Sequence, residues 1–219
     1  MASVTLLHKG MTLVGESGIS YILVTPLVQR TIPNVWKACR LNDGKDQYVI
    51  KHPQSDDSPE KRWPHFRKEL EMQRLFRPAK FIRKMIDIIP PRSDFGPTMM
   101  VLEPFERTLW SARTRRPLTT REIKHIMKLA LLGLREIHEK GLVYCGTLIL
   151  RSKGGAETSL CITDFKMDNV LLNGFNDADP ASDDETVALG INVKLADLGS
   201  GKKSMRPCCL RDHSNNTFV

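Results

Sequence analysis

The 219-residue chain lacks any long apolar run. No segment approaches the roughly 18 to 20 consecutive apolar residues that a helix needs to cross a bilayer. The N-terminal stretch MASVTLLHKGMTLVG also lacks a basic segment followed by a sustained apolar one, as a secretory leader would have. We therefore expect no membrane partner and an intracellular protein, cytoplasmic or nuclear. With 41% apolar and 26% charged residues, the chain can form a packed core in one large domain or two small ones.

Cysteines with metal-ligand spacing are also missing. The five cysteines are odd in number, and no C-x-x-C occurs among them. They are Cys39, Cys145, Cys161, Cys208 and Cys209. This pattern gives no sign of a zinc site built on paired cysteines, and we expect the thiols to be reduced.

Aromatic residues make up only 6% of the chain, and they form no stacking pattern beside its basic residues. The net charge is nevertheless +8, with a high density of lysine and arginine over residues 61–84 and an acidic patch over 177–185. Binding of nucleic acid is one interpretation of the basic stretch. We favour a solvated helix face, because Glu69 and Glu71 interleave with the cations and no binding motif accompanies them. No nucleic-acid partner is expected.

The first half of the chain alternates strand and helix signals. Apolar and β-branched runs predict strands at 21–27, 35–41, 47–51, 81–89 and 98–105. Asn42-Asp43-Gly44 between the second and third of these predicts a hairpin turn. Helical spacing predicts one helix over 64–76, which Pro78 closes.

A longer helix is predicted from Thr119 or Thr120, either of which can cap it, to Gly141. Its apolar residues go almost all the way around, so we expect it to be buried on most faces. Two further strands, at 169–174 and 191–199, flank the acidic loop. No internal repeat is visible, and the tail from residue 201 has no periodicity.

One short stretch carries the candidate chemistry. Asp164, Lys166 and Asn169 stand in the order D-x-K-x-x-N, directly before the apolar run 170–172. By itself this motif is weak, because all three residue types are common in turns. Its surroundings strengthen it: Lys51 ends a predicted strand, Glu69 lies on the helix that follows, and Asp197-Leu198-Gly199 closes the last hairpin.

In this order, these residues resemble the signature set of the eukaryotic protein kinases of the Ser/Thr type, over roughly residues 11–200. The resemblance implies an α+β, protein kinase-like fold: an antiparallel-sheet N-lobe with one helix over 1–104, then a hinge and the beginning of a mainly helical C-lobe over 105–200. It also implies a transferase that uses ATP and Mg²⁺ to phosphorylate protein hydroxyls. The 201–219 tail lies outside the resemblance.

The resemblance assigns nucleotide roles to several residues. Lys51 would hold the phosphates, and Glu69 would orient Lys51; Glu69 is preferred to Glu71 because of its distance from Pro78. The segment MVLEPFERTLW resembles the hinge that receives adenine, with backbone groups from Glu103 to Phe105 as binders.

The remaining roles concern the metal and the acceptor. Asn169 and Asp197 would anchor Mg²⁺, which prefers hard oxygen ligands. Asp164 would orient or deprotonate the acceptor hydroxyl, and Lys166 would neutralise the transferred group.

The chain departs from the family in two places. The glycine-rich phosphate loop is missing, since VQRTIPN stands in its place and Pro33 donates no N–H. Joining 141–145 directly to 164–169 restores the family's spacing, which marks 146–163 as an insert. Codons compatible with splice sites at the ends of 146–163 and at Gly201-Lys202 suggest retained introns. We therefore expect a truncated, inactive chain; the alternatives are a pseudokinase or scaffold module without catalysis, and a basic nucleic-acid-binding protein.

Overall fold

The computed structural model describes residues 7–28, 33–41, 46–53, 59–91, 97–140, 142–143, 165–181, 189–198 and 202–203. The predicted hairpin turn at 42–44, the insert 146–163 and nearly all of the 201–219 tail lie outside these residues, and so does Asp164. Among the described helices, none combines the length and the apolar character that a bilayer-spanning segment requires.

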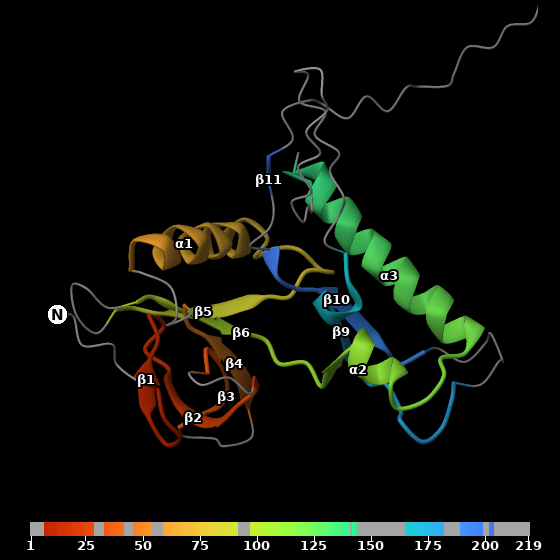
Figure 1. Cartoon of the computed structure of the whole chain (residues 1–219), viewed down its shortest axis with the longest axis horizontal. Coiled ribbons are helices and arrows are strands. Elements are labelled where there is room, and N and C mark those ends of the chain that lie inside the picture. Colours follow the sequence, from red (N-terminus) through yellow and green to blue (C-terminus); the bar gives the residue numbers. More distant parts are fainter. Residues whose placement is uncertain are drawn as a thin grey trace, which may run out of the picture.

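A six-stranded sheet forms the first half of the molecule (Figure 1). Its strands are β1 (Thr12–Val14), β2 (Ser20–Pro26), β3 (Val35–Arg40), β4 (Gln47–Lys51), β5 (Met85–Ile89) and β6 (Met99–Leu102). They follow the order β1-β2-β3-β4-β6-β5, and every neighbouring pair is antiparallel. The antiparallel sheet expected from the sequence is present. The three-residue β1 was not predicted, because it is too short to show a period.

Helix α1 (Pro59–Leu75) covers one face of this sheet beside β5 (Figure 1). Its Phe66 and Leu70 pack with Val49, Met100 and Leu102. The intervening strand residues Ile50, Met99 and Val101 point to the other face, where they join a second core with Tyr21 and Trp36. Both faces of β4 and β6 are therefore covered, which explains why these strands have continuous apolar runs and no polar alternation.

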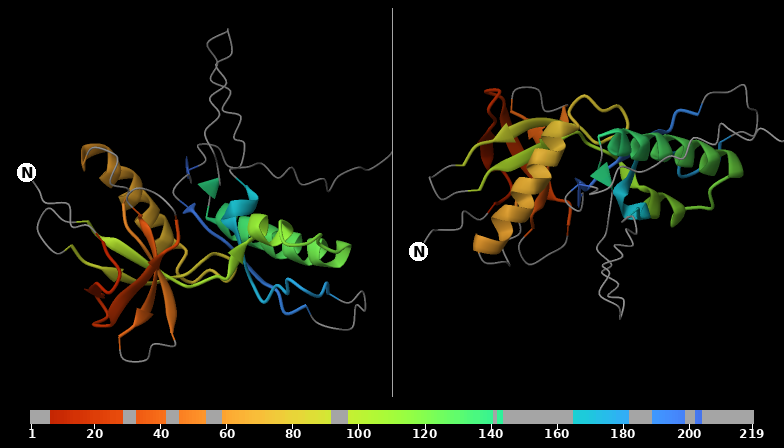
Figure 2. Two further views of the ribbon diagram at one scale, coloured as in Figure 1. Left: turned by 60° about the horizontal axis from the view of Figure 1, so that its bottom comes forward. Right: turned by 90° about the horizontal axis from the view of Figure 1, so that it is seen from above.

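The second half contains a long helix and short strands, and Figure 2 shows it beside the first half. Strand β7 (Arg107–Thr108) leads into the short helix α2 (Leu109–Arg113), and the long helix α3 (Thr120–Glu139) follows. The 3-10 turn η1 (Met167–Asn169) precedes β9 (Val170–Asn173) and β10 (Asn192–Leu195). These two strands join β7 in a three-stranded sheet with the order β10-β9-β7. Strand β8 (Leu142–Val143) pairs with β11 (Lys202–Lys203).

Helix α3 begins with a reciprocal capping box. The Thr119 side chain accepts a bond from the Glu122 backbone N–H, and the Glu122 carboxylate accepts one from the Thr119 N–H. The expectation that this helix is buried on most faces is wrong. It buries one face, through Ile126, Ala130 and Ile137, whereas Ile123 and Leu131 remain 46% and 57% exposed. The spacing of apolar residues and their number do not determine how many faces of a helix are covered by other elements.

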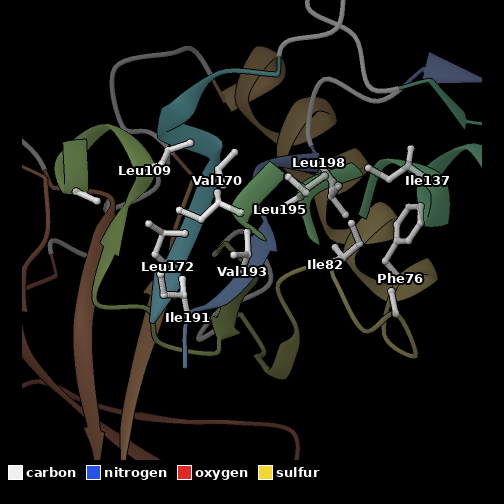
Figure 3. Packing of buried hydrophobic residues seen from close by; sticks show 14 of the residues in the cluster. Phe76, Ile82, Leu109, Ile137, Val170, Leu172, Ile191, Val193, Leu195 and Leu198 are labelled. Atoms are coloured by element: carbon white, nitrogen blue, oxygen red, sulfur yellow. The ribbon is translucent and has the colours of Figure 1, made fainter. Parts of the chain in front are cut away.

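The segment after α1 joins the two halves. The Leu195 N–H donates to the Phe81 carbonyl at 2.9 Å, and the Arg83 N–H donates to the Leu195 carbonyl at 2.8 Å. Glu136 of α3 accepts bonds from the N–H groups of Lys80 and Phe81, both at 2.9 Å. Phe76 and Ile82 thereby enter the core formed by α3, β9 and β10, as Figure 3 shows.

Gly133 lets α3 approach this junction closely. A Cβ atom at Gly133 would lie 3.0 Å from Leu195 Cδ1 and 3.0 Å from the Phe81 carbonyl oxygen, which the bonds above hold in place. Gly133→Val should therefore lower the free energy of unfolding by about 2 kcal/mol, as overpacking does, despite valine's better helix propensity. Urea unfolding would measure this.

The matched control is Gly190→Val. A Cβ at the exposed Gly190 has no atom within 4 Å, so this variant should change the unfolding free energy by less than about 0.5 kcal/mol. Equal stability of the two variants would show that the junction is not tightly packed at Gly133.

Candidate active site

Lys51 is the last residue of β4 and shares its sheet face with Val49, which packs against α1. On α1, Glu69 stands three residues after the buried Phe66, so it lies on the side of the helix that meets the sheet. Lys51 Nζ is 2.5 Å from Glu69 Oε1. The lysine side chain is 22% exposed and that of the glutamate 10%. Glu71, the other candidate, is exposed.

The Glu69 carboxyl has a raised pKa. Burial is the largest cause; the Lys51 ammonium opposes it, and the Asp197 charge adds to it. Glu69 therefore depends on Lys51 to remain ionised in this position. The Glu69 carboxylate, which has little access to water, holds the Lys51 ammonium in a fixed position.

Asp197 approaches the same ammonium from the opposite half of the molecule. It follows β10, and its Oδ1 atom is 3.8 Å from Lys51 Nζ. Its φ of 61° lies in the left-handed region, which residues other than glycine rarely adopt. Two neighbours hold the backbone there: the Ala196 N–H donates to the Asn169 carbonyl at 2.9 Å, and Leu198 is 2% exposed in the core.

Asn169 ends η1 and is buried, at 6% exposure. Its N–H donates to the Lys166 carbonyl at 2.9 Å, which closes a tight turn. The Lys166 side chain is exposed. The structure thus brings Lys51, Glu69 and Asp197 together. Asn169 stands directly before β9, and its carbonyl is bonded to the N–H of Ala196, the residue before Asp197. Asp164 falls outside the described residues, so its predicted place in the site stays a prediction.

The predicted hinge carries bonds within the chain. The Glu103 N–H donates to the Lys84 carbonyl at 3.0 Å, and the Glu103 carbonyl accepts a bond from Arg83 Nε at 2.9 Å. A carbonyl oxygen has a second lone pair, so this group can still accept a bond from a base. Phe105, the other predicted hinge residue, is half-buried.

Two residues at this hinge gave no signal in the sequence. Lys194 of β10 lies 2.6 Å from Glu103 Oε1, and both side chains are largely buried. Arg83 is held behind the hinge, where burial lowers the pKa of its guanidinium to about 10 while Glu103 and Glu69 oppose that shift. Arg83 therefore keeps its charge at neutral pH. These partners are distant in sequence, and no local motif marks them.

An antiparallel sheet with one covering helix, joined through a hinge to a smaller part that presents Asp197 to Lys51, is a protein kinase-like fold. No family model and no curated protein matches the chain. Among solved structures, it is similar to vaccinia related kinase 3, with a TM-score of 0.50 and 16% identity. The match covers 92% of this chain and 54% of that one, so the chain spans about half the length of that kinase.

The pairing of Lys51 with Glu69 leads to a prediction about how the stability of a variant depends on pH. In Lys51→Met, Glu69 loses the cation that lowers its pKa, so the folded state should bind a proton that the unfolded state does not. Stability of this variant should therefore rise as the pH falls towards the unfolded pKa of Glu69. We expect a loss of about 2 kcal/mol at pH 8 that shrinks by pH 5, measured by urea unfolding.

The control for this prediction is the double variant Lys51→Met/Glu69→Gln, which has no carboxyl to titrate. Since Glu69 also titrates in the parent chain, the comparison is with Lys51→Met. The unfolding free energy of the double variant should lack the rise between pH 8 and pH 5 that Lys51→Met shows. An equal loss in Lys51→Met at both pH values would contradict the dependence of Glu69 on Lys51.

Proposed function

We propose that the site around Lys51 binds ATP with Mg²⁺, and that it serves phosphoryl transfer to serine or threonine hydroxyls of a protein. The observation that carries the proposal is the position of Lys51 between two carboxylates, Glu69 at 2.5 Å and Asp197 at 3.8 Å. Phosphoryl transfer depends mainly on position and charge, and a lysine fixed in this way can hold nucleotide phosphates.

The residues for magnesium are Asn169 and Asp197. An amide oxygen and a carboxylate are hard ligands of the kind that Mg²⁺ accepts, and the ion usually keeps several waters and takes further oxygens from the nucleotide. The two residues are joined by the Asn169 to Ala196 backbone bond, and Asp197 is 47% exposed on the side of Lys51. When bound, the ion would neutralise phosphate charge. Among the described residues, no larger group of His, Cys, Asp or Glu offers another metal site.

The acceptor side rests on Asp164 and Lys166. We assign Asp164 to the orientation or deprotonation of the hydroxyl, and the exposed Lys166 to the charge of the transferred group. A binding or scaffold module without catalysis is the second candidate. It is favoured by VQRTIPN, which has no glycine where phosphates would be covered, and by the insert 146–163 directly before Asp164.

Metal-dependent nucleotide binding is the first test. Asp197→Asn should weaken binding of a fluorescent ATP analogue about tenfold in the presence of Mg²⁺ and change it little in EDTA, since the carboxylate acts through the ion. Asp168→Asn, which alters an exposed carboxylate on η1, is the control and should bind like the parent chain. If Asp197→Asn and the parent chain show the same Mg²⁺ dependence, Asp197 is not a metal ligand.

Phosphoryl transfer is the second test, and it separates the two candidates. A chain that joins Cys145 directly to Asp164 should bind the ATP analogue more tightly than the chain with 146–163, because the loop before Asp164 is then short and rigid. In that form, Asp164→Asn should lower transfer by about 10²- to 10⁴-fold and spare ATP affinity. Nucleotide binding without any transfer would favour the scaffold module.

A further inference from the structure

A cationic face lies beside η1, on α2 and the turn that follows it. The sequence RTLWSARTRR over 107–116 contains four arginines and no carboxylate. Two of them are engaged: Arg107 pairs with Asp177, and Arg116 pairs with Glu122 at 2.7 Å. The other two, Arg113 and Arg115, are exposed, and neither forms an ion pair with any residue that the structure describes.

Arg113 is held in place by an aromatic ring. Its guanidinium lies 5.0 Å from the centre of the Trp110 ring, and its Nη1 atom is 3.7 Å from Met167 Sδ in η1. Trp110 itself is 47% exposed. We name Trp110, Arg113 and Arg115 the α2 face. It combines a fixed cation, a second cation and an open aromatic surface in one place.

This composition suits a binding surface. A large aromatic side chain costs free energy when it stays in water, and tryptophan and arginine are the residues that carry most binding energy at protein interfaces. Two carboxylates lie nearby. Asp177 pairs with Arg107 and also interacts electrostatically with Arg115, without an ion pair to it, and the exposed Asp168 on η1 forms no ion pair with either arginine of the face. An anionic partner would therefore find two arginines with free donor capacity.

The position of the face points to the partner. Helix α2 packs directly against η1, the turn that begins after Lys166 and ends at Asn169. A polypeptide whose hydroxyl reaches this turn passes close to Trp110 and Arg113. Nucleic acid is less well matched, because a phosphate backbone needs a longer track of free cations than these two arginines provide.

We infer that the α2 face binds an acidic segment of the protein that carries the acceptor hydroxyl. Glutamate or aspartate side chains of this segment bond to Arg113 and Arg115, and an apolar part of it covers the Trp110 ring. The inference rests on the proposed function for the identity of the partner, and it names the class of substrate: serine or threonine in an acidic sequence.

Peptide binding tests the inference without any need for catalysis. The probe is a fluorescein-labelled peptide with a central serine between glutamates, and its counterpart has glutamine at each glutamate. The 219-residue chain should bind the acidic peptide and not the glutamine peptide in fluorescence anisotropy at low salt. Arg113→Glu/Arg115→Glu should weaken binding of the acidic peptide at least about tenfold, and Trp110→Ala, which leaves the charge unchanged, about threefold or more.

The control is Arg74→Glu/Arg77→Glu, which makes the same charge change at two exposed arginines at the end of α1. It should bind the acidic peptide like the parent chain. Equal weakening in the two double variants would overturn the inference, because only net charge would then matter. Stronger binding of a single-stranded oligonucleotide, lost in Arg113→Glu/Arg115→Glu, would also overturn it in favour of nucleic acid. Should the glutamate variant fail to fold, Arg113→Gln/Arg115→Gln replaces it under the same criteria.

Parallel titration of the ATP analogue separates this inference from the proposed function. Peptide binding that depends on the α2 face, in a chain that binds no nucleotide, would support the face and refute the proposed transfer. Nucleotide binding together with peptide affinity that is insensitive to Arg113 and Arg115 would overturn the face and leave the proposed transfer in place.

Discussion

The two backbone hydrogen bonds that Leu195 forms with Phe81 and Arg83 are the constraint on which the site depends. They place the end of β10 against the segment that leaves α1, and Glu136 fixes that segment to α3 by two further bonds of 2.9 Å. Asp197 follows Leu195 by two residues, so its distance from Lys51 is set by this junction. Gly133 makes the close approach possible, since any side chain there would push α3 away from Leu195. Without the junction, the two carboxylates beside Lys51 would belong to parts of the molecule that move separately.

The two carboxylates beside Lys51 differ in their distance from it and in their exposure to water. Glu69 is buried and committed to the lysine, whereas Asp197 is half exposed and lies farther away, at 3.8 Å. One carboxylate therefore orients the ammonium, and the other remains available to a cation. The similarity to vaccinia related kinase 3 establishes the fold, and at 16% identity it establishes no more than that. The proposed function is argued from the local geometry around Lys51, and the binding and transfer experiments test it.

Two departures from a typical kinase sequence bear on the proposed site. The sequence VQRTIPN contains no glycine at the position of the family's glycine-rich segment, and the insert 146–163 directly precedes Asp164 in the sequence. A long loop costs little closure entropy, so the core around η1 and β9 can form beside it. The proposed role of Asp164 requires precise placement, which is a stricter demand than folding, because a small displacement of a catalytic group lowers the rate strongly. The α2 face does not share this weakness, since Trp110 and Arg113 stand on a helix that packs against η1.

The sequence by itself determined the elements whose signals are local. Strand β4, the capped start of α3 and the strands β9 and β10 follow from periodicity and capping residues. The kinase-like fold was predicted from Lys51, Glu69, the D-x-K-x-x-N motif of residues 164–169 and Asp197-Leu198-Gly199, in that order. Tertiary structure alone decided what depends on distant partners. Four features arise from contacts between residues far apart in the chain. They are the burial of α3 on one face, the bond of Arg83 to the Glu103 carbonyl, the Lys194–Glu103 ion pair and the left-handed backbone of Asp197. Such contacts form only when the two halves of the molecule pack together. Their stability therefore depends on residues that are distant in the sequence, and a short stretch of sequence cannot predict them.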